Sequence, residues 1–139
     1  MNFMSAEVVI VKPDAVQAMA ALNAAAELLT SANERLNTDD FGNSFEDSRG
    51  SIRVAVSALM FRDGVIAQTL ESAVAYLTEK YPDSFPLEKW EEIEKTVTGE
   101  GPGLMNAIIG IMGKKTRKEE AEDAMKVAIE FLDTVKTMV

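Results

Sequence analysis

Three arginines near the middle of the chain, Arg49, Arg53 and Arg62, are the side chains best suited to bind an anion. Arg49 and Arg53 are four residues apart, so on a helix they lie on one face. The planar guanidinium group donates paired hydrogen bonds, which suit a phosphate or the carboxylates of a partner. The same groups can instead pair with nearby acids of this chain, such as Glu46 and Asp47. The sequence leaves both interpretations open.

Two pairs of carboxylates offer a second kind of chemistry. They are Glu88 with Glu91, and Glu120 with Asp123. Oxygen ligands three residues apart on a helix can share a Mg²⁺ ion, which then binds a triphosphate. The pattern Glu-x-x-Glu followed by Glu-x-x-Asp resembles the all-α nucleoside triphosphate pyrophosphatases of the MazG type, which implies a Mg²⁺-dependent hydrolase with the four carboxylates in one cleft. In the other interpretation, Glu120 and Asp123 simply offset a helix dipole.

The chain contains neither histidine nor cysteine. Without imidazole, general acid–base catalysis falls to carboxylates, lysine or tyrosine. Without imidazole or thiolate, a zinc site lacks its usual ligands. We therefore expect no cofactor except Mg²⁺ in the hydrolase interpretation, and the sequence favours a binding protein over an enzyme.

The charge balance limits the possible partners. The 139 residues include 23 acidic and 14 basic side chains, which gives a net charge of −9. Broad binding to nucleic acid needs a basic face, so no such surface is expected. No apolar run has the length of a membrane span, and the N-terminus lacks the pattern of a signal peptide. We expect one cytoplasmic domain over residues 1–139 with no membrane contact.

Apolar residues recur at spacings of three and four along most of the chain, which is typical of helices that bury one face. The expected helices cover residues 13–36, 47–62, 69–81, 86–97, 104–112 and 116–138, with loops at 37–43 and 99–103. Gly64 should end the second helix in the left-handed conformation, and Thr116 with Glu119 should form a capping box. Residues 52–61 are apolar on nearly all sides, which places them inside a bundle or at a subunit interface.

Residues 7–12, Glu-Val-Val-Ile-Val-Lys, are rich in β-branched side chains and precede Pro13, which favours an extended arm. A lone strand has no partner inside a helical domain, so a strand, a swapped arm and a helical turn all stay open. Residues 8–17 resemble the opening strand and turn of nucleoside diphosphate kinases, in which the lysine, here Lys12, approaches the phosphates. That family transfers phosphate through a histidine, which this chain lacks.

Two stretches are similar to helices of HEPN domains, small helical bundles of prokaryotes. Residues 47–65 resemble the second HEPN helix, with Arg49 at its opening arginine, and residues 117–139 resemble the last. The resemblance implies a four- or five-helix bundle that is often dimeric. Its catalytic members carry an Arg and a His on the last helix as a ribonuclease site. Arg117 is the one arginine there and no histidine follows it, so nuclease activity is not expected.

The sequence thus predicts an all-α fold, a four- to five-helix up-down bundle with a short extended N-terminal arm. The expected function is that of a non-catalytic HEPN-like module, a homodimer that binds a nucleotide or a protein partner of the toxin–antitoxin or nucleotidyltransferase-associated type. The apolar segments 52–61 and 104–112 motivate the dimer. The Mg²⁺-dependent pyrophosphatase and a purely structural helical protein are the alternatives.

Overall fold

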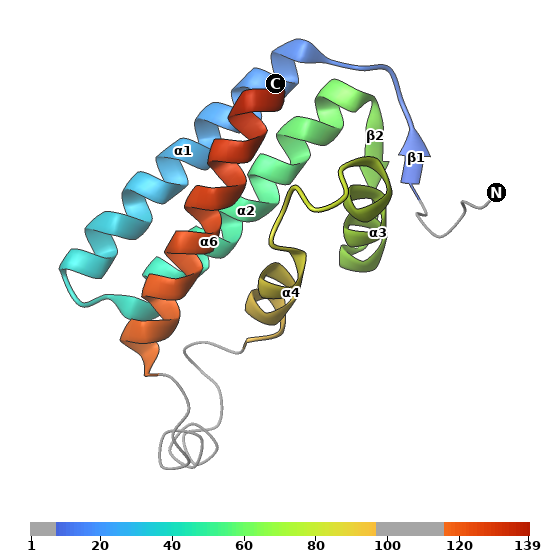
Figure 1. Cartoon of the computed structure of the whole chain (residues 1–139). Coiled ribbons are helices and arrows are strands. Elements are labelled where there is room, and N and C mark those ends of the chain that lie inside the picture. Colours follow the sequence, from blue (N-terminus) through green and yellow to red (C-terminus); the bar gives the residue numbers. More distant parts are fainter. Residues whose placement is uncertain (1–7, 97–115) are drawn as a thin grey trace.

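A computed structural model describes residues 8–96 and 116–139, which hold five helices and two short strands. Three long helices, α1 (Ala15–Asn37), α2 (Phe41–Asp63) and α6 (Arg117–Met138), form the main bundle (Figure 1). The predicted all-α bundle is therefore confirmed, with a small sheet added to it. The expected segments 99–103 and 104–112 lie outside the described residues. None of the described helices is long and apolar enough to cross a membrane.

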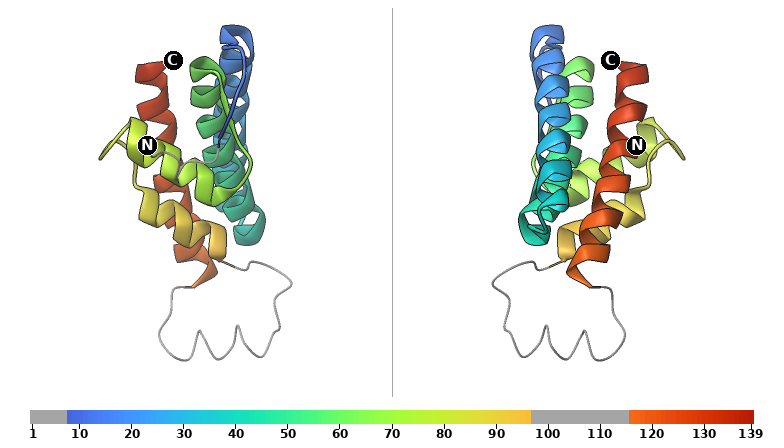
Figure 2. Two further views of the ribbon diagram at one scale, coloured as in Figure 1. Left: turned by 90° about the vertical axis from the view of Figure 1, so that its right-hand side faces the viewer. Right: turned by 90° about the vertical axis from the view of Figure 1, so that its left-hand side faces the viewer.

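The helices form a bundle with two shorter members at its side. α1 and α2 make an antiparallel hairpin, and α6 runs in the same direction as α2 (Figure 1). The two shorter helices, α3 (Leu70–Lys80) and α4 (Leu87–Lys95), lie on one side of the long helices (Figure 2).

Small side chains allow the long helices to pack closely. Ala18, Ala25 and Ala32 of α1 are buried seven residues apart, on one face of the helix. Two buried serines of α2 donate hydrogen bonds to carbonyl oxygens of α1: Ser44 to Ala32 at 2.7 Å and Ser51 to Ala25 at 2.8 Å. α2 also packs on α6 and is buried on several sides, as its sequence predicts.

The turn between α1 and α2 is shorter than predicted, because α2 already begins at Phe41 rather than near residue 47. Phe45 is buried in this first part of the helix. Arg35 of α1 bridges to α2 through Asp40 at 3.0 Å and Asp47 at 2.9 Å. Packing and ion pairing thus extend the helix over residues with weak helix propensity.

The N-terminal arm is a strand that pairs within the chain. β1 (Val8–Ile10) runs antiparallel to β2 (Val65–Ala67), with Val9 opposite Ile66. The expectation that the arm has no partner inside the domain is therefore wrong, because a three-residue strand follows the end of α2. Gly64 ends α2 at a φ of 76°, as predicted, and turns the chain into β2.

Two tyrosines attach the α3 region to the end of α2. The hydroxyls of Tyr76 and Tyr81 donate to the same oxygen, Oδ2 of Asp63, at 2.8 and 2.6 Å. Burial, the hydrogen bond and the negative charge of Asp63 raise the pKa of Tyr81 to about 12. The same three causes raise the pKa of Tyr76.

We expect this arrangement to give a distinct alkaline titration. The folded protein holds both phenolic protons more tightly than the unfolded chain, in which tyrosine ionises near about pH 10. The resulting stabilisation is complete below that pH and is lost as the pH rises through the folded value of Tyr81, about 12. An absorbance titration of tyrosinate is simple here, because the chain has two tyrosines. Ionisation of the two tyrosines of the folded chain near the usual pKa of tyrosine would contradict their contact with Asp63. The Asp63→Asn variant should lower the pKa values of both tyrosines.

Candidate functional site

Two of the predicted arginines meet at α4. Arg49 and Arg53 lie one turn apart on α2, and both reach Glu94 on α4. Arg53 forms a two-pronged ion pair with the carboxylate, with Nε 2.8 Å from Oε2 and Nη2 2.5 Å from Oε1. Arg49 donates from Nη1 to the backbone oxygen of Glu94 at 3.2 Å. Together these contacts fix α4 against α2.

The guanidinium of Arg49 contacts other groups of this chain. Its Nη2 pairs with Glu46 at 2.6 Å, and its guanidinium carbon lies 5.1 Å from the ring centre of Phe45. The residue is buried, and its Nε has no partner among the described residues. A buried arginine that is paired in this way binds groups of its own chain rather than a ligand.

Glu94 accepts three hydrogen bonds through its carboxylate. Besides the two from Arg53, the indole Nε1 of Trp90 donates at 3.0 Å. Burial acts to raise the pKa of Glu94, but the hydrogen bonds and charge of Arg53, with smaller contributions from Trp90 and Arg49, lower it on balance. Glu94 therefore remains ionised and holds Arg53 and Trp90 in place.

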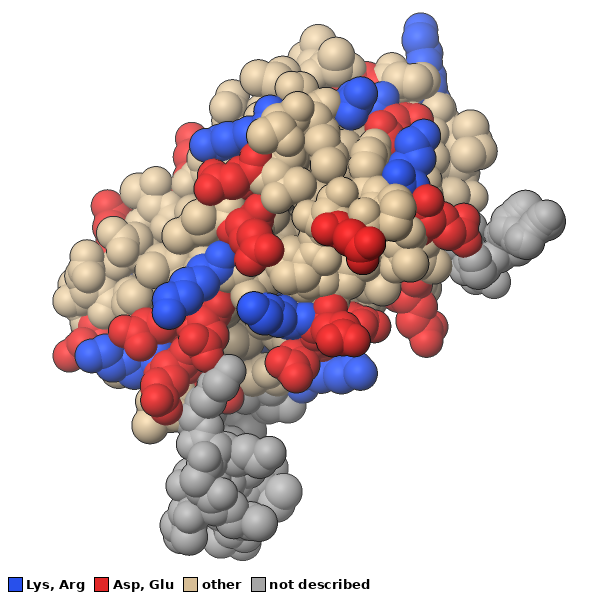
Figure 3. Space-filling model, viewed as in Figure 1, with Lys and Arg blue, Asp and Glu red and all other residues tan. Residues whose placement is uncertain are grey.

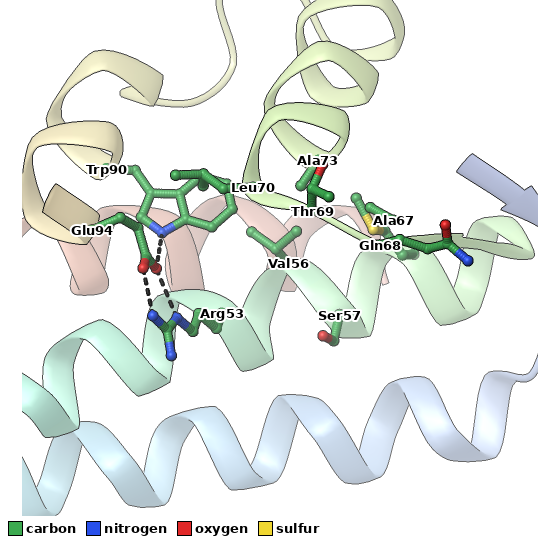
Figure 4. A pocket seen from close by; sticks show the side chains of 11 residues that line it. Arg53, Val56, Ser57, Ala67, Gln68, Thr69, Leu70, Ala73, Trp90 and Glu94 are labelled. Atoms are coloured by element: carbon green, nitrogen blue, oxygen red, sulfur yellow. Dashed lines mark hydrogen bonds and ion pairs between the residues drawn. The ribbon is translucent and has the colours of Figure 1, made fainter. Parts of the chain in front are cut away.

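A pocket of about 330 Å³ opens beside this ion pair, between α2, the junction of β2 with α3, and α4. Arg53, Glu94 and Trp90 lie at one end of it and Gln68 lies at the other (Figure 4). Between the two ends lie the apolar side chains of Val56, Leu70 and Ala73 and the hydroxyl-bearing Ser57 and Thr69, and Met60 also lines the pocket. The pocket thus combines apolar groups with a few polar ones, which is a common composition of ligand sites.

The third predicted arginine lies elsewhere. Arg62 follows Arg53 by nine residues, which is half a turn more than two full turns of a helix, so it projects from the opposite side of α2. Arg62 instead lies close enough to Tyr76 and Tyr81 to act on their pKa values. The three arginines therefore do not form one anion site. Arg49 and Arg53 instead form ion pairs with acidic residues of this chain, Glu46 and Glu94.

The four predicted metal ligands are not brought together. Glu88 and Glu91 lie beside a second pocket of about 450 Å³ near Val74 and Thr78 of α3. Glu120 and Asp123 belong to the first two turns of α6, where Thr116 and Glu119 form the predicted capping box. In the described ranges, 8–96 and 116–139, no group of three or more acidic side chains is placed to hold a metal ion.

The large apolar side chains exposed among the described residues are Val9, Ile10, Val16, Met19, Ile66 and Ile129. The first five belong to β1, to its partner strand β2 and to the start of α1, and we call them the N-terminal apolar surface. Val16 is 81% and Ile10 76% exposed. Val9 lies opposite Ile66 in the sheet, and Val16 and Met19 are three residues apart on α1, so each pair presents neighbouring apolar groups to water.

The face in Figure 3 carries intermingled acidic and basic side chains without a continuous basic area. In a chain of net charge −9, acidic side chains outnumber the basic ones that could contact phosphates.

Two features of the candidate sites could not be predicted from the sequence. Trp90 and Glu94 are four residues apart, a spacing that places them on one helix face, yet nothing in the sequence says that Arg53 meets them. The exposure of the N-terminal apolar surface depends on where β1 and α1 lie, which periodicity alone does not give.

Comparison of the chain with protein-family models, with curated proteins and with solved structures finds no match. The HEPN resemblance and the two enzyme resemblances therefore stay predictions from sequence.

Proposed function

We propose that the protein is a non-catalytic helical module that acts by binding protein, and that it first binds a second copy of itself through the N-terminal apolar surface. The observation that carries this proposal is the exposure of those five large apolar side chains. Burying them in a homodimer would remove apolar area from water, which is the main driving force of association.

The charge distribution limits which surfaces two copies of the chain can bring together. Each copy carries −9, so two copies repel wherever their acidic surfaces meet. Residues 15–26 contain no charged side chain, and between residues 8 and 14 the charged ones are Lys12 and Asp14. Two copies can approach on this part of the surface with little repulsion. A basic partner, by contrast, would be drawn to the acidic parts of the molecule.

The backbone of β1 supports the same surface. Val11 donates to the oxygen of Gly64 at 2.9 Å, and hydrogen-bonded pairs alternate along an antiparallel ladder. Val9 therefore bonds with Ile66, while the backbone groups of Val8 and Ile10 point away from β2. In the described part of the chain the sheet has these two strands only, so the outer edge of β1 can pair with another strand.

The predicted nucleotide role has less support, because the guanidinium groups on which it rests bind acceptors of this chain. A heterologous protein partner, of the kind that the HEPN resemblance implies, is the alternative occupant of the N-terminal apolar surface. It would leave the isolated chain monomeric.

Charges introduced on the surface test the proposal. We expect the unaltered chain to be a dimer at micromolar concentration, and the double variant Val16→Glu, Met19→Glu to be a monomer, because each dimer would bury four new carboxylates. Both side chains are exposed, so the fold should persist. Size-exclusion chromatography with light scattering gives the mass, and far-UV circular dichroism checks the fold.

The matched control is Thr30→Glu with Asn33→Glu, which adds two carboxylates at the same spacing on an exposed part of α1. It should remain a dimer. A monomeric unaltered chain, or a dimer that survives Val16→Glu with Met19→Glu, would overturn the proposal.

A further inference from the structure

The pocket between α2, α3 and α4 has a lining without net charge. Its charged residues are Arg53 and Glu94, and these bind each other through two hydrogen bonds. The Glu94 side chain is 9% exposed, and its carboxylate already accepts from Arg53 and Trp90. An anion bound beside Arg53 would approach Glu94, and a cation bound beside Glu94 would approach Arg53. A charged ligand therefore gains little in this pocket.

Neutral hydrogen-bonding groups fit both ends of the pocket. A guanidinium has five N–H groups, and two of those on Arg53 donate to the carboxylate of Glu94. The Arg53 side chain is 58% exposed. The rest have no partner among the described residues and can donate to a carbonyl oxygen. At the other end, the exposed Gln68 offers an amide that both donates and accepts (Figure 4).

The pocket fits an apolar group of limited size. Val56, Met60, Leu70 and Ala73 contribute aliphatic carbon and sulfur to its lining, beside the hydroxyls of Ser57 and Thr69. Its volume, about 330 Å³, is near the lower end of the range for ligand sites. It can hold a branched or aromatic side chain but not a large cofactor.

We infer that this pocket binds an uncharged ligand with an apolar body flanked by amide groups, as found in a peptide segment that carries a large apolar side chain. The apolar body lies over Val56 and Leu70, Arg53 donates to one carbonyl group, and Gln68 bonds with the amide at the other end. A free small amide has the same chemistry, and the experiment below separates the two sources. The inference does not rest on self-association.

Trp90 supplies the readout, because it is the one tryptophan of the chain, lines the pocket and is 3% exposed. Its fluorescence would be followed on titration with three compounds that share a leucine body: N-acetyl-leucinamide, which is neutral, N-acetyl-leucine, which is an anion, and leucinamide as its cation at slightly acidic pH. We expect a saturable change with the neutral compound and about fivefold weaker binding of either charged one.

A blocking variant locates the site. Ser57 lines the pocket and is exposed, so Ser57→Phe should fill the opening without disturbing the core and should abolish the fluorescence change. Asn33→Phe, on an exposed part of α1 outside the pocket, should leave it intact. Far-UV circular dichroism confirms that both variants fold.

The outcomes are distinct. Tighter binding of acetyl-Ala-Leu-Ala-amide than of N-acetyl-leucinamide assigns the site to a peptide, and the reverse assigns it to a free small amide. No saturable change with either neutral compound, tighter binding of a charged compound, or unaltered binding in Ser57→Phe would overturn the inference. The Val16→Glu, Met19→Glu variant should bind as the unaltered chain does, so this test and that of the dimer can fail separately.

Discussion

Replacing Phe131 with alanine should lower the free energy of unfolding by about 3–5 kcal/mol. Phe131 of α6 is fully buried. Its ring stacks on Phe85 with 5.1 Å between centroids, and it meets the ring of Trp90 edge-on at 5.5 Å. The substitution removes this contact and leaves a cavity where α4 docks on the bundle. Chemical denaturation followed by far-UV circular dichroism measures the loss.

The partial variant Phe131→Leu serves as the control, because it keeps most of the apolar volume and should lose about 1.5 kcal/mol. Since Trp90 is in contact with Phe131, the alanine variant should also shift the Trp90 emission towards that of an exposed indole. A loss below about 1 kcal/mol for Phe131→Ala would mean that α4 does not depend on this cluster.

Gly64→Ala should cost at least about 2 kcal/mol, because two penalties add at one residue. The φ of 76° is unfavourable for any residue with a Cβ atom. That atom would also lie 2.7 Å from the backbone oxygen of Val11 and 2.9 Å from Cγ of Pro13. The contact is with backbone rather than with a flexible side chain, so β1 and the start of α1 must move away. Thermal and denaturant unfolding would show the effect.

Gly50→Ala is the matched control within the same helix. A Cβ atom at Gly50 would lie 3.5 Å from Cδ1 of Leu28, an ordinary contact. Alanine is the better helix former, so this variant should gain about 0.5–1 kcal/mol. Equal effects of the two substitutions would contradict the close approach of the N-terminal arm to Gly64.

The helices could be predicted where periodicity and end signals agree. Thr116 with Glu119 marks the start of α6, and Gly64 marks the end of α2, because these are local interactions written in a few adjacent residues. The start of α2 could not be placed, since Phe41 belongs to the helix through packing and ion pairs with α1. β2 is too short to produce an alternating pattern, so the partner of β1 was missed.

The site was predicted less completely than the fold, because it depends on contacts between distant residues. The sequence indicates Arg53 as a binding residue, and Arg53 does line a pocket, but its pairing with Glu94, forty-one residues away, neutralises it. The carboxylate pairs satisfy a local spacing rule, yet α4 and α6 do not bring them together as a metal site. Local spacing supplies candidates, and tertiary packing decides which of them meet.

Self-association through the N-terminal apolar surface can be measured by sedimentation equilibrium of the unaltered chain over a range of concentrations. We expect a mass of twice the chain at micromolar concentration, which falls towards that of one chain on dilution. Val16→Glu with Met19→Glu should give the mass of one chain throughout. A single-chain mass for the unaltered protein at every concentration would show that the N-terminal apolar surface does not mediate self-association.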